Sequence, residues 1–158
     1  MPVRSMLLLI SLITILCSWA TADELDLGIK PQMDTKSYIK YRENLMNNAR
    51  HYRKNINAIL RDKVNTHQHL LAQAQALYNL SKMYADVFPE GSSLGDTRAM
   101  EEIWQNPAGF QARLDKHTQD TAELLQAIES GDNALAKKAL SKVGKSCTGC
   151  HTLYRSKD

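Results

Sequence analysis

The chain has 158 residues, with 20 Lys and Arg against 17 Asp and Glu, and it is 43% hydrophobic but only 6% aromatic. This length and composition fit one globular domain and argue against disordered, collagen-like and multi-span membrane proteins. The formal charge of +3 comes without a Lys/Arg tract, so nothing indicates nucleic-acid binding. Seven Gly and four Pro in a sequence rich in Ala, Leu, Lys, Gln and Glu favour long helices over sheets.

The first 22 residues predict a signal peptide that is removed on export. Arg4 precedes an apolar run, 6–17, that is too short to span a bilayer comfortably. Ala20 and Ala22 are the small residues that a signal peptidase reads, so we expect cleavage after Ala22. The mature domain, residues 23–158, is then expected in the bacterial periplasm without stable membrane insertion. A retained N-terminal anchor is the alternative.

The mature chain predicts four amphipathic helices, because apolar residues recur at steps of three and four, the spacing of one helix face. Asn106, followed by Pro107, and Asp132 are expected N-caps of the last two helices. Helices of this length predict an all-α fold, an antiparallel four-helix bundle. The expected helices cover about residues 35–60, 64–86, 107–128 and 133–154, with the longest loop at 91–105.

The chemistry of the sequence is concentrated in Cys147-Thr148-Gly149-Cys150-His151. Two thiols at this spacing can add to the vinyl groups of a haem, and the imidazole of the next residue can reach the iron. On a helix, Cys150 and His151 lie three and four residues after Cys147, so the three side chains share one face. The motif predicts one covalently attached haem c, bound through two thioethers, with His151 as an iron ligand.

Three other interpretations of the motif have less support: a redox pair of cysteines, a zinc site and a chance occurrence of the pattern. A disulfide or a thioredoxin-like redox site would use Cys147 and Cys150, but no predicted strand precedes this helix and no βαβ pattern is present. A zinc site would need further Cys or His residues at fixed spacing nearby, and the sequence lacks them. Covalent haem attachment therefore remains the prediction.

The motif and its surroundings resemble the class II c-type cytochromes, the family of cytochrome c′ and its low-spin relatives. The resemblance rests on Cys147, Cys150 and His151 on the last of four helices, followed by Tyr154-Arg155. Three further segments, 39–42, 102–104 and 130–132, also resemble the sequence of this family at the corresponding places. The resemblance implies a left-twisted bundle with the haem held between helices near one end, and in many members a homodimer formed through helices 1 and 2.

The resemblance also implies roles for two arginines. Arg42 would lie near a haem propionate, and Arg155, one turn after His151, would lie near the proximal imidazole. The alternative for each arginine is a solvated position at the edge of the bundle.

Met46 occupies the position that separates the branches of this family. It stands five residues after Tyr41, where cytochrome c′ commonly has an apolar, non-ligating residue and the low-spin branch has methionine. Met46 shares a helix stripe with Arg42 and Ala49, so it can face the haem. We therefore expect Met46 as the second axial ligand, with an ordinary core methionine as the alternative. His117, inward-facing on the third helix, is a further candidate ligand, with a hydrogen bond to a neighbour as its alternative.

With both axial positions filled, the iron changes oxidation state without exchanging a ligand, which favours electron transfer over substrate chemistry. We expect a low-spin periplasmic electron carrier, not an enzyme, with redox proteins as partners. The alternative is a five-coordinate cytochrome c′ that binds nitric oxide or carbon monoxide. A peroxidase-like activity has less support, because no distal acid/base pair is apparent. Lysines that can select acidic partners at the haem edge, with an ordinary solvated helix face as the alternative, are Lys137, Lys138, Lys142, Lys145 and Lys157.

Overall fold

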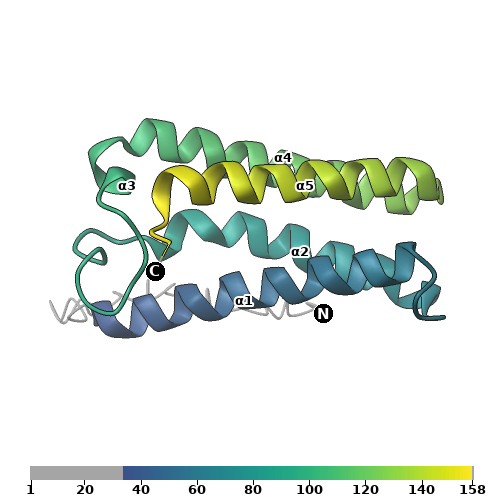
Figure 1. The fold of residues 1–158 in the computed structure, drawn as a ribbon, viewed down its shortest axis with the longest axis horizontal. Helices are drawn as coiled ribbons and strands as arrows, with labels where there is room; N and C mark the ends of the chain where they lie inside the picture. The colour runs from purple at the N-terminus through teal and green to yellow at the C-terminus, as the bar shows by residue number, and fades with distance from the viewer. Residues whose placement is uncertain (1–33, 158) are drawn as a thin grey trace, which may run out of the picture. The chain divides into compact units, whose positions relative to one another are not determined.

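The computed structural model describes residues 34–157, so the predicted signal peptide lies outside the described residues. Four long helices lie side by side, with α1 and α2 forming one pair and α4 and α5 the other (Figure 1). Successive long helices run in opposite directions, which confirms the predicted all-α four-helix bundle. The helices are α1 (Thr35–Leu60), α2 (Leu70–Met83), α3 (Glu102–Gln105), α4 (Pro107–Glu129) and α5 (Asn133–Tyr154), with 3-10 turns η1 (His67–His69) and η2 (Tyr84–Val87) flanking α2.

Short polar side chains cap three of the long helices. The side chain of Asp34 accepts a hydrogen bond from the backbone of Lys36 at the start of α1. Asn106 accepts from the Gly109 amide at 3.0 Å, and Asp132 accepts from the Leu135 amide at 2.9 Å. Each bond satisfies a backbone N–H that the first turn of a helix leaves without a partner. The predicted N-caps of α4 and α5 are confirmed.

The second helix begins later than predicted. Asp62 adopts φ 54° just after α1, in the left-handed region, and the Lys63 amide donates to the Ala58 carbonyl at 3.0 Å, so the helix ends here. Thr66 makes no side-chain capping bond, and only the single turn η1 precedes Leu70. Without a capped start, the apolar pattern from residue 64 onward does not become regular α-helix until residue 70.

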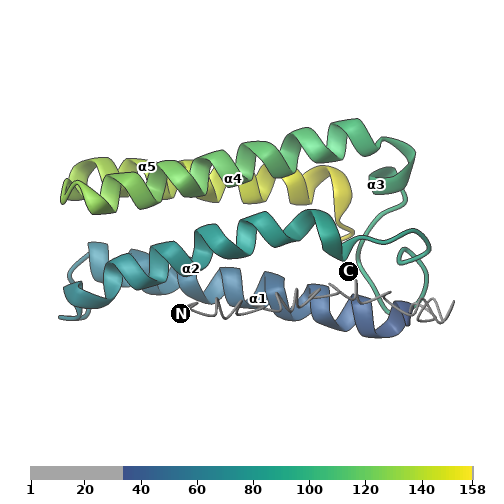
Figure 2. The same cartoon turned by 180° about the vertical axis from the view of Figure 1, so that it is seen from behind.

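Two apolar clusters fill the bundle. The first joins all four long helices and includes the fully buried Ile56, Leu77, Leu124 and Val143. The second lies around α3 and the 84–104 segment, the looped end seen from behind in Figure 2, and includes Tyr84, Ile103, Phe110 and Tyr154. Cys147 packs against the first cluster and Cys150 against the second. The Cys-x-x-Cys-His motif therefore sits where the two clusters meet.

Within residues 34–157, no helix combines the length and the apolar character needed to cross a membrane.

Candidate haem-binding site

A cavity of about 420 Å³ opens between the helices and brings every predicted site residue together. Its volume falls within the roughly 300–1,000 Å³ range of sites for small molecules and cofactors. Cys147, Cys150 and His151 line it from α5, while Met46 lines it from α1. Arg42, Arg155 and His117 complete the set of residues singled out from the sequence. Apolar walls come from Ala49, Leu77, Tyr84, Phe88, Ala99, Ile103, Phe110, Leu114, Val143 and Tyr154.

The motif side chains are chemically suited to covalent haem attachment. Cys147 and Cys150 are both free thiols and both are half-buried. Burial raises the pKa of the Cys147 thiol and raises the pKa of Cys150 to about 11, so both sulfurs remain protonated at neutral pH. Addition of each S–H across a vinyl group needs this thiol and releases no atom. An apolar cavity with two such thiols and one imidazole fits a haem.

The surroundings of His151 favour its neutral imidazole form. Burial lowers the pKa of His151, and the positive charges of Arg155 and Arg98 lower it further. A neutral imidazole keeps a nitrogen lone pair for a metal ion. The Arg155 Nη1 atom lies 3.5 Å from the His151 Nδ1 atom, so the predicted position of Arg155 beside this imidazole agrees with the geometry.

Arg42 is buried, and its guanidinium holds the long loop that follows η2. Nη1 donates to the carbonyl of Val87 at 3.2 Å and to Ser92 Oγ at 2.9 Å, while Nη2 donates to the Ser92 carbonyl at 3.0 Å and to Thr97 Oγ1 at 2.8 Å. The guanidinium carbon also lies 4.7 Å from the ring centre of Phe88. Both terminal nitrogens are thus bonded to the loop, a role that the sequence did not reveal. The contact with a haem propionate stays a prediction.

His117 is buried on α4 and has a hydrogen-bonding partner within the bundle. Its Nδ1 atom lies 3.0 Å from Ser146 Oγ, and its ring stacks on Tyr84 with centres 5.7 Å apart. The same nitrogen is 4.0 Å from the sulfur of Cys147. Burial lowers the pKa of His117 to about 4, although Asp120 partly opposes this shift. These contacts match the alternative given for His117, a buried histidine bonded to a neighbour.

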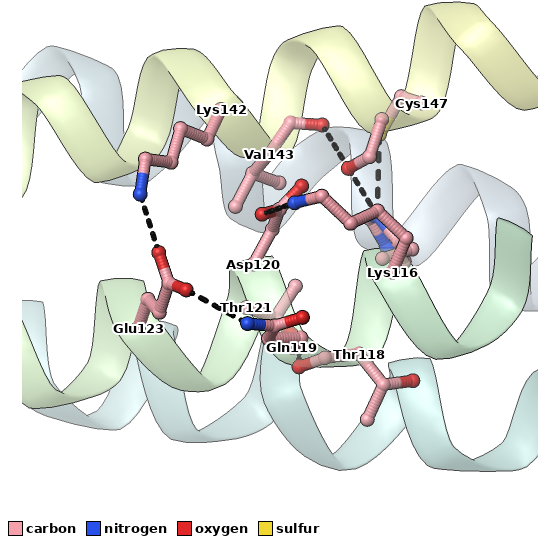
Figure 3. A network of polar contacts seen from close by, with 11 residues as sticks. Lys116, Thr118, Gln119, Asp120, Thr121, Glu123, Lys142, Val143 and Cys147 are labelled. Carbon is pink, nitrogen blue, oxygen red and sulfur yellow. Dashed lines mark hydrogen bonds and ion pairs between the residues drawn. The ribbon is translucent and has the colours of Figure 1, made fainter.

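Polar contacts between α4 and α5 restrict one of the predicted docking lysines. Figure 3 shows Lys116 reaching Asp120 along α4, and Lys142 of α5 reaching Glu123 of α4. The Lys142 nitrogen lies 2.6 Å from the Glu123 carboxylate, and this hydrogen bond raises the pKa of Lys142. Because Lys142 is already paired, it is a poorer candidate than its neighbours for selecting an acidic partner.

The sequence analysis missed most of the arginines at the cavity. Six arginines line it, whereas among the described lining residues Glu43 is the only acidic one. A signal was available, since Arg50 and Arg53 follow Met46 at steps of four and three on one helix stripe. Arg98 and Arg113 come from a loop and from another helix, and no local pattern places them here. The six are Arg42, Arg50, Arg53, Arg98, Arg113 and Arg155.

Comparison with known proteins assigns this arrangement to a family. The family model described as cytochrome c′ matches residues 37–155. Cytochrome c′ of Pararhodospirillum photometricum is 27% identical over 121 residues, covering 76% of this chain and 97% of that protein. The structure of cytochrome c prime from Shewanella frigidimarina has a TM-score of 0.73 and 30% identity, covering 78% and 97% of the two chains. A nitric oxide complex of a mutant cytochrome c prime from Alcaligenes xylosoxidans has a TM-score of 0.71 and 25% identity, covering 78% and 97%.

These matches overturn the predicted low-spin branch. The family model and the relatives above are cytochromes c′, so the prediction of a low-spin electron carrier, with Met46 as a second axial ligand opposite His151, is wrong. The five-coordinate alternative fits the matches better. Met46 is half-buried and packs against the second apolar cluster, where a flexible thioether fills space as well as any apolar residue. Sequence position alone did not distinguish this filling role from ligation.

Proposed function

Because the chain belongs to the cytochrome c′ family, whose members bind one covalent c-type haem, we propose that it is a periplasmic protein that binds nitric oxide or carbon monoxide. The haem, when bound, supplies an iron with one open position at which such a gas can coordinate. The family match over residues 37–155 is the observation that carries the proposal. The nitric oxide complex of a relative with 25% identity supports the choice of gas.

In this proposal α5 supplies the proximal side. Cys147 and Cys150 fix the porphyrin to the helix, and His151 provides the imidazole ligand from the next turn. Burial lowers the pKa of His151, and this favours the neutral imidazole, which keeps one nitrogen lone pair for a metal ion. The Arg155 Nη1 atom lies 3.5 Å from the Nδ1 atom of His151, where its charge opposes protonation of the ring.

The opposite wall, from α1, would face the gas. Met46 and Ala49 line the cavity there and are joined by Leu77 of α2. These side chains offer no acid or base and present only apolar surface, which excludes water and favours a small uncharged ligand. The other α1 residues at the cavity are polar or charged, namely Arg42, Glu43, Asn47, Arg50 and Arg53.

Visible absorption of the purified protein tests this proposal. We expect a broad high-spin Soret band in the resting protein and direct, saturable binding of carbon monoxide and nitric oxide after reduction. His151→Ala keeps both cysteines and is the matched control, because it retains the covalent haem but loses the proximal imidazole. A low-spin spectrum with a weak far-red band in the parent, together with slow or absent carbon monoxide binding, contradicts the proposal.

We also propose a homodimer formed through α1 and α2. Tyr41 near the start of α1 and Leu71 near the start of α2 are 45% and 49% exposed. Because these two helices are antiparallel, the two side chains lie at opposite ends of the pair, and a two-fold axis would bring Tyr41 of one copy toward Leu71 of the other. Leu71→Glu should shift sedimentation toward the monomer. Leu135→Glu on α5, a residue 47% exposed outside this pair, should not.

A further inference from the structure

A second hollow lies outside the haem cavity, between α1 and α5. It has a volume of about 820 Å³, and its charged lining residues are Arg53, Arg61, Lys137 and Lys145. No Asp or Glu occurs among the described residues that line it. The remaining walls are Asn57, Leu140, Ser141, Gly144, Thr148 and Gly149. We call this hollow the α1–α5 groove.

The four cations of the α1–α5 groove have no acidic partner within residues 34–157. The ion pairs of this part of the chain use Lys40, His67, Lys116 and Lys142 instead. Arg61 donates from Nε to Asn57 Oδ1 at 3.0 Å, which orients its guanidinium but leaves its charge uncompensated. Like charges gathered along one groove repel one another, so a bound anion would relieve an unfavourable interaction.

The cations are arranged in two pairs along the groove. Arg53 and Arg61 are eight residues apart near the end of α1, and Lys137 and Lys145 are eight residues apart on α5. Eight residues of helix rise about 12 Å. Because α1 and α5 run in opposite directions (Figure 1), Arg61 lies at the same end as Lys137, and Arg53 at the same end as Lys145. An elongated anion that lies along the groove can therefore contact the Arg61–Lys137 pair at one end and the Arg53–Lys145 pair at the other.

We propose that the α1–α5 groove binds a small linear polyanion, of the oligophosphate or polycarboxylate type. The amide of Asn57 and the hydroxyl of Ser141 add neutral hydrogen-bonding groups between the cations. Gly144 gives the wall of α5 no side chain beside the Arg53 guanidinium, whose Nη1 atom would lie 4.0 Å from a Cβ atom at this position, so an anion bound to Arg53 can approach the helix closely. This volume and lining suit a small polar ligand better than an apolar one.

Occupancy of the groove is linked to the haem. Thr148 and Gly149, the two residues between the attachment cysteines, form part of its wall, and Arg53 lines both the groove and the haem cavity. A negative charge bound here stabilises ferric over ferrous iron, because the oxidised centre carries one more positive charge. Anion binding should thus lower the midpoint potential. This inference requires the covalent haem but does not depend on gas binding.

Isothermal titration of the purified holoprotein with inorganic tripolyphosphate tests the groove, at fixed ionic strength because such contacts are screened by salt. We expect saturable binding that is tighter than that of pyrophosphate, and much tighter than that of orthophosphate. Arg61→Gln and Lys137→Gln should each weaken tripolyphosphate binding about tenfold, which is about 1.4 kcal/mol. Addition of tripolyphosphate should lower the midpoint potential of the parent. It should lower the potential much less in the variant that combines Arg61→Gln with Lys137→Gln.

Lys138→Gln is the matched control. Lys138 is the exposed neighbour of Lys137 on α5, but it does not line the groove. Its removal should change the affinity less than twofold. Absorption spectra that match the parent show that each variant is folded and loaded with haem. Equal weakening by Lys138→Gln and Lys137→Gln would mean that anions respond only to the general surface charge, and the proposal would be wrong. It would also be wrong if the parent bound no tripolyphosphate at millimolar concentration.

Discussion

A methionine on the wall of an apolar cavity can ligate a haem iron or simply fill space, and both roles favour the same register on a helix. Met46 lies on the stripe that faces α5, as the spacing from Arg42 predicted, and it lines the cavity with His151. The position was therefore predicted correctly while the role was not. Ligation depends on the direction of one sulfur at the end of three rotatable bonds, which residue spacing does not specify.

Met46→Ala should leave the spin state unchanged, because the proposed five-coordinate iron has no bond to the Met46 sulfur. The shortened side chain should enlarge the gas side of the cavity and speed carbon monoxide binding to the reduced protein. Removal of a half-buried side chain should cost about 1–3 kcal/mol of unfolding free energy, toward the lower end of the range for buried methionines. Flash photolysis and urea unfolding measure the two effects.

Met46→Leu is the control for that experiment, since it keeps the volume but removes the sulfur. It should resemble the parent in both spectrum and stability. A parent that is low-spin and becomes high-spin in both variants would restore the sulfur as a ligand and overturn the five-coordinate assignment.

His117 gives the stability of the fold a predictable dependence on pH. Burial lowers the pKa of His117 to about 4, against about 6.5 for an exposed histidine. The unfolded chain therefore binds this proton more readily, so stability is complete above pH 6.5 and is lost as the pH falls toward 4. Between pH 7 and pH 5 this residue should reduce the unfolding free energy by about 2 kcal/mol.

His117→Leu should make the unfolding free energy less dependent on pH over that interval, whatever its effect at pH 7. Urea titrations of the holoprotein at pH 7, 6 and 5 measure the slope. His51→Leu, an exposed position on α1, is the control and should retain the slope of the parent. An unchanged slope in His117→Leu would show that His117 does not titrate in this way.

At the scale of elements, the helices were predictable because their signals are local. Asn106 and Asp132 mark the starts of α4 and α5 through short side-chain bonds, and the three- and four-residue spacing defines the buried faces. The segment between η2 and α3 was predicted only as a loop. Its conformation depends on Arg42, which lies 45 to 55 residues away from the groups that it binds. No local pattern reports such a contact.

Arg42→Gln should release this loop from the bundle. The change removes bonds to Ser92 and Thr97 and leaves buried acceptors without donors, which should cost about 2–4 kcal/mol of unfolding free energy. Limited proteolysis should then cut faster between residues 88 and 101. Arg50→Gln, an exposed cavity arginine on the same helix, should change neither measurement appreciably. Equal protease resistance in parent and Arg42→Gln would show that Arg42 does not hold the loop.

Over the described bundle, the attachment motif was predictable because its three functional residues lie within one stretch of five, 147–151, but the electrostatics of the cavity were not. Arg98 and Arg113 reach the cavity from a loop and from α4, and only the packing of the bundle brings them toward α1 and α5. The α1–α5 groove likewise combines residues from the two ends of the sequence. Charge distributions of this kind depend on tertiary structure, and the formal net charge of +3 does not predict them.

The intact mass of the purified protein tests both the predicted removal of residues 1–22 and the covalent attachment of the haem. Cleavage after Ala22 should give a chain that begins at Asp23 and contains residues 23–158. Because addition of the Cys147 and Cys150 thiols to vinyl groups releases no atom, the mass should equal that chain plus one complete haem. Ala20→Lys should block cleavage, since signal peptidase requires a small residue at that position. A mass that includes residues 1–22 in the parent would instead indicate a tethered protein, and haem lost on acid-acetone extraction would exclude the thioether bonds.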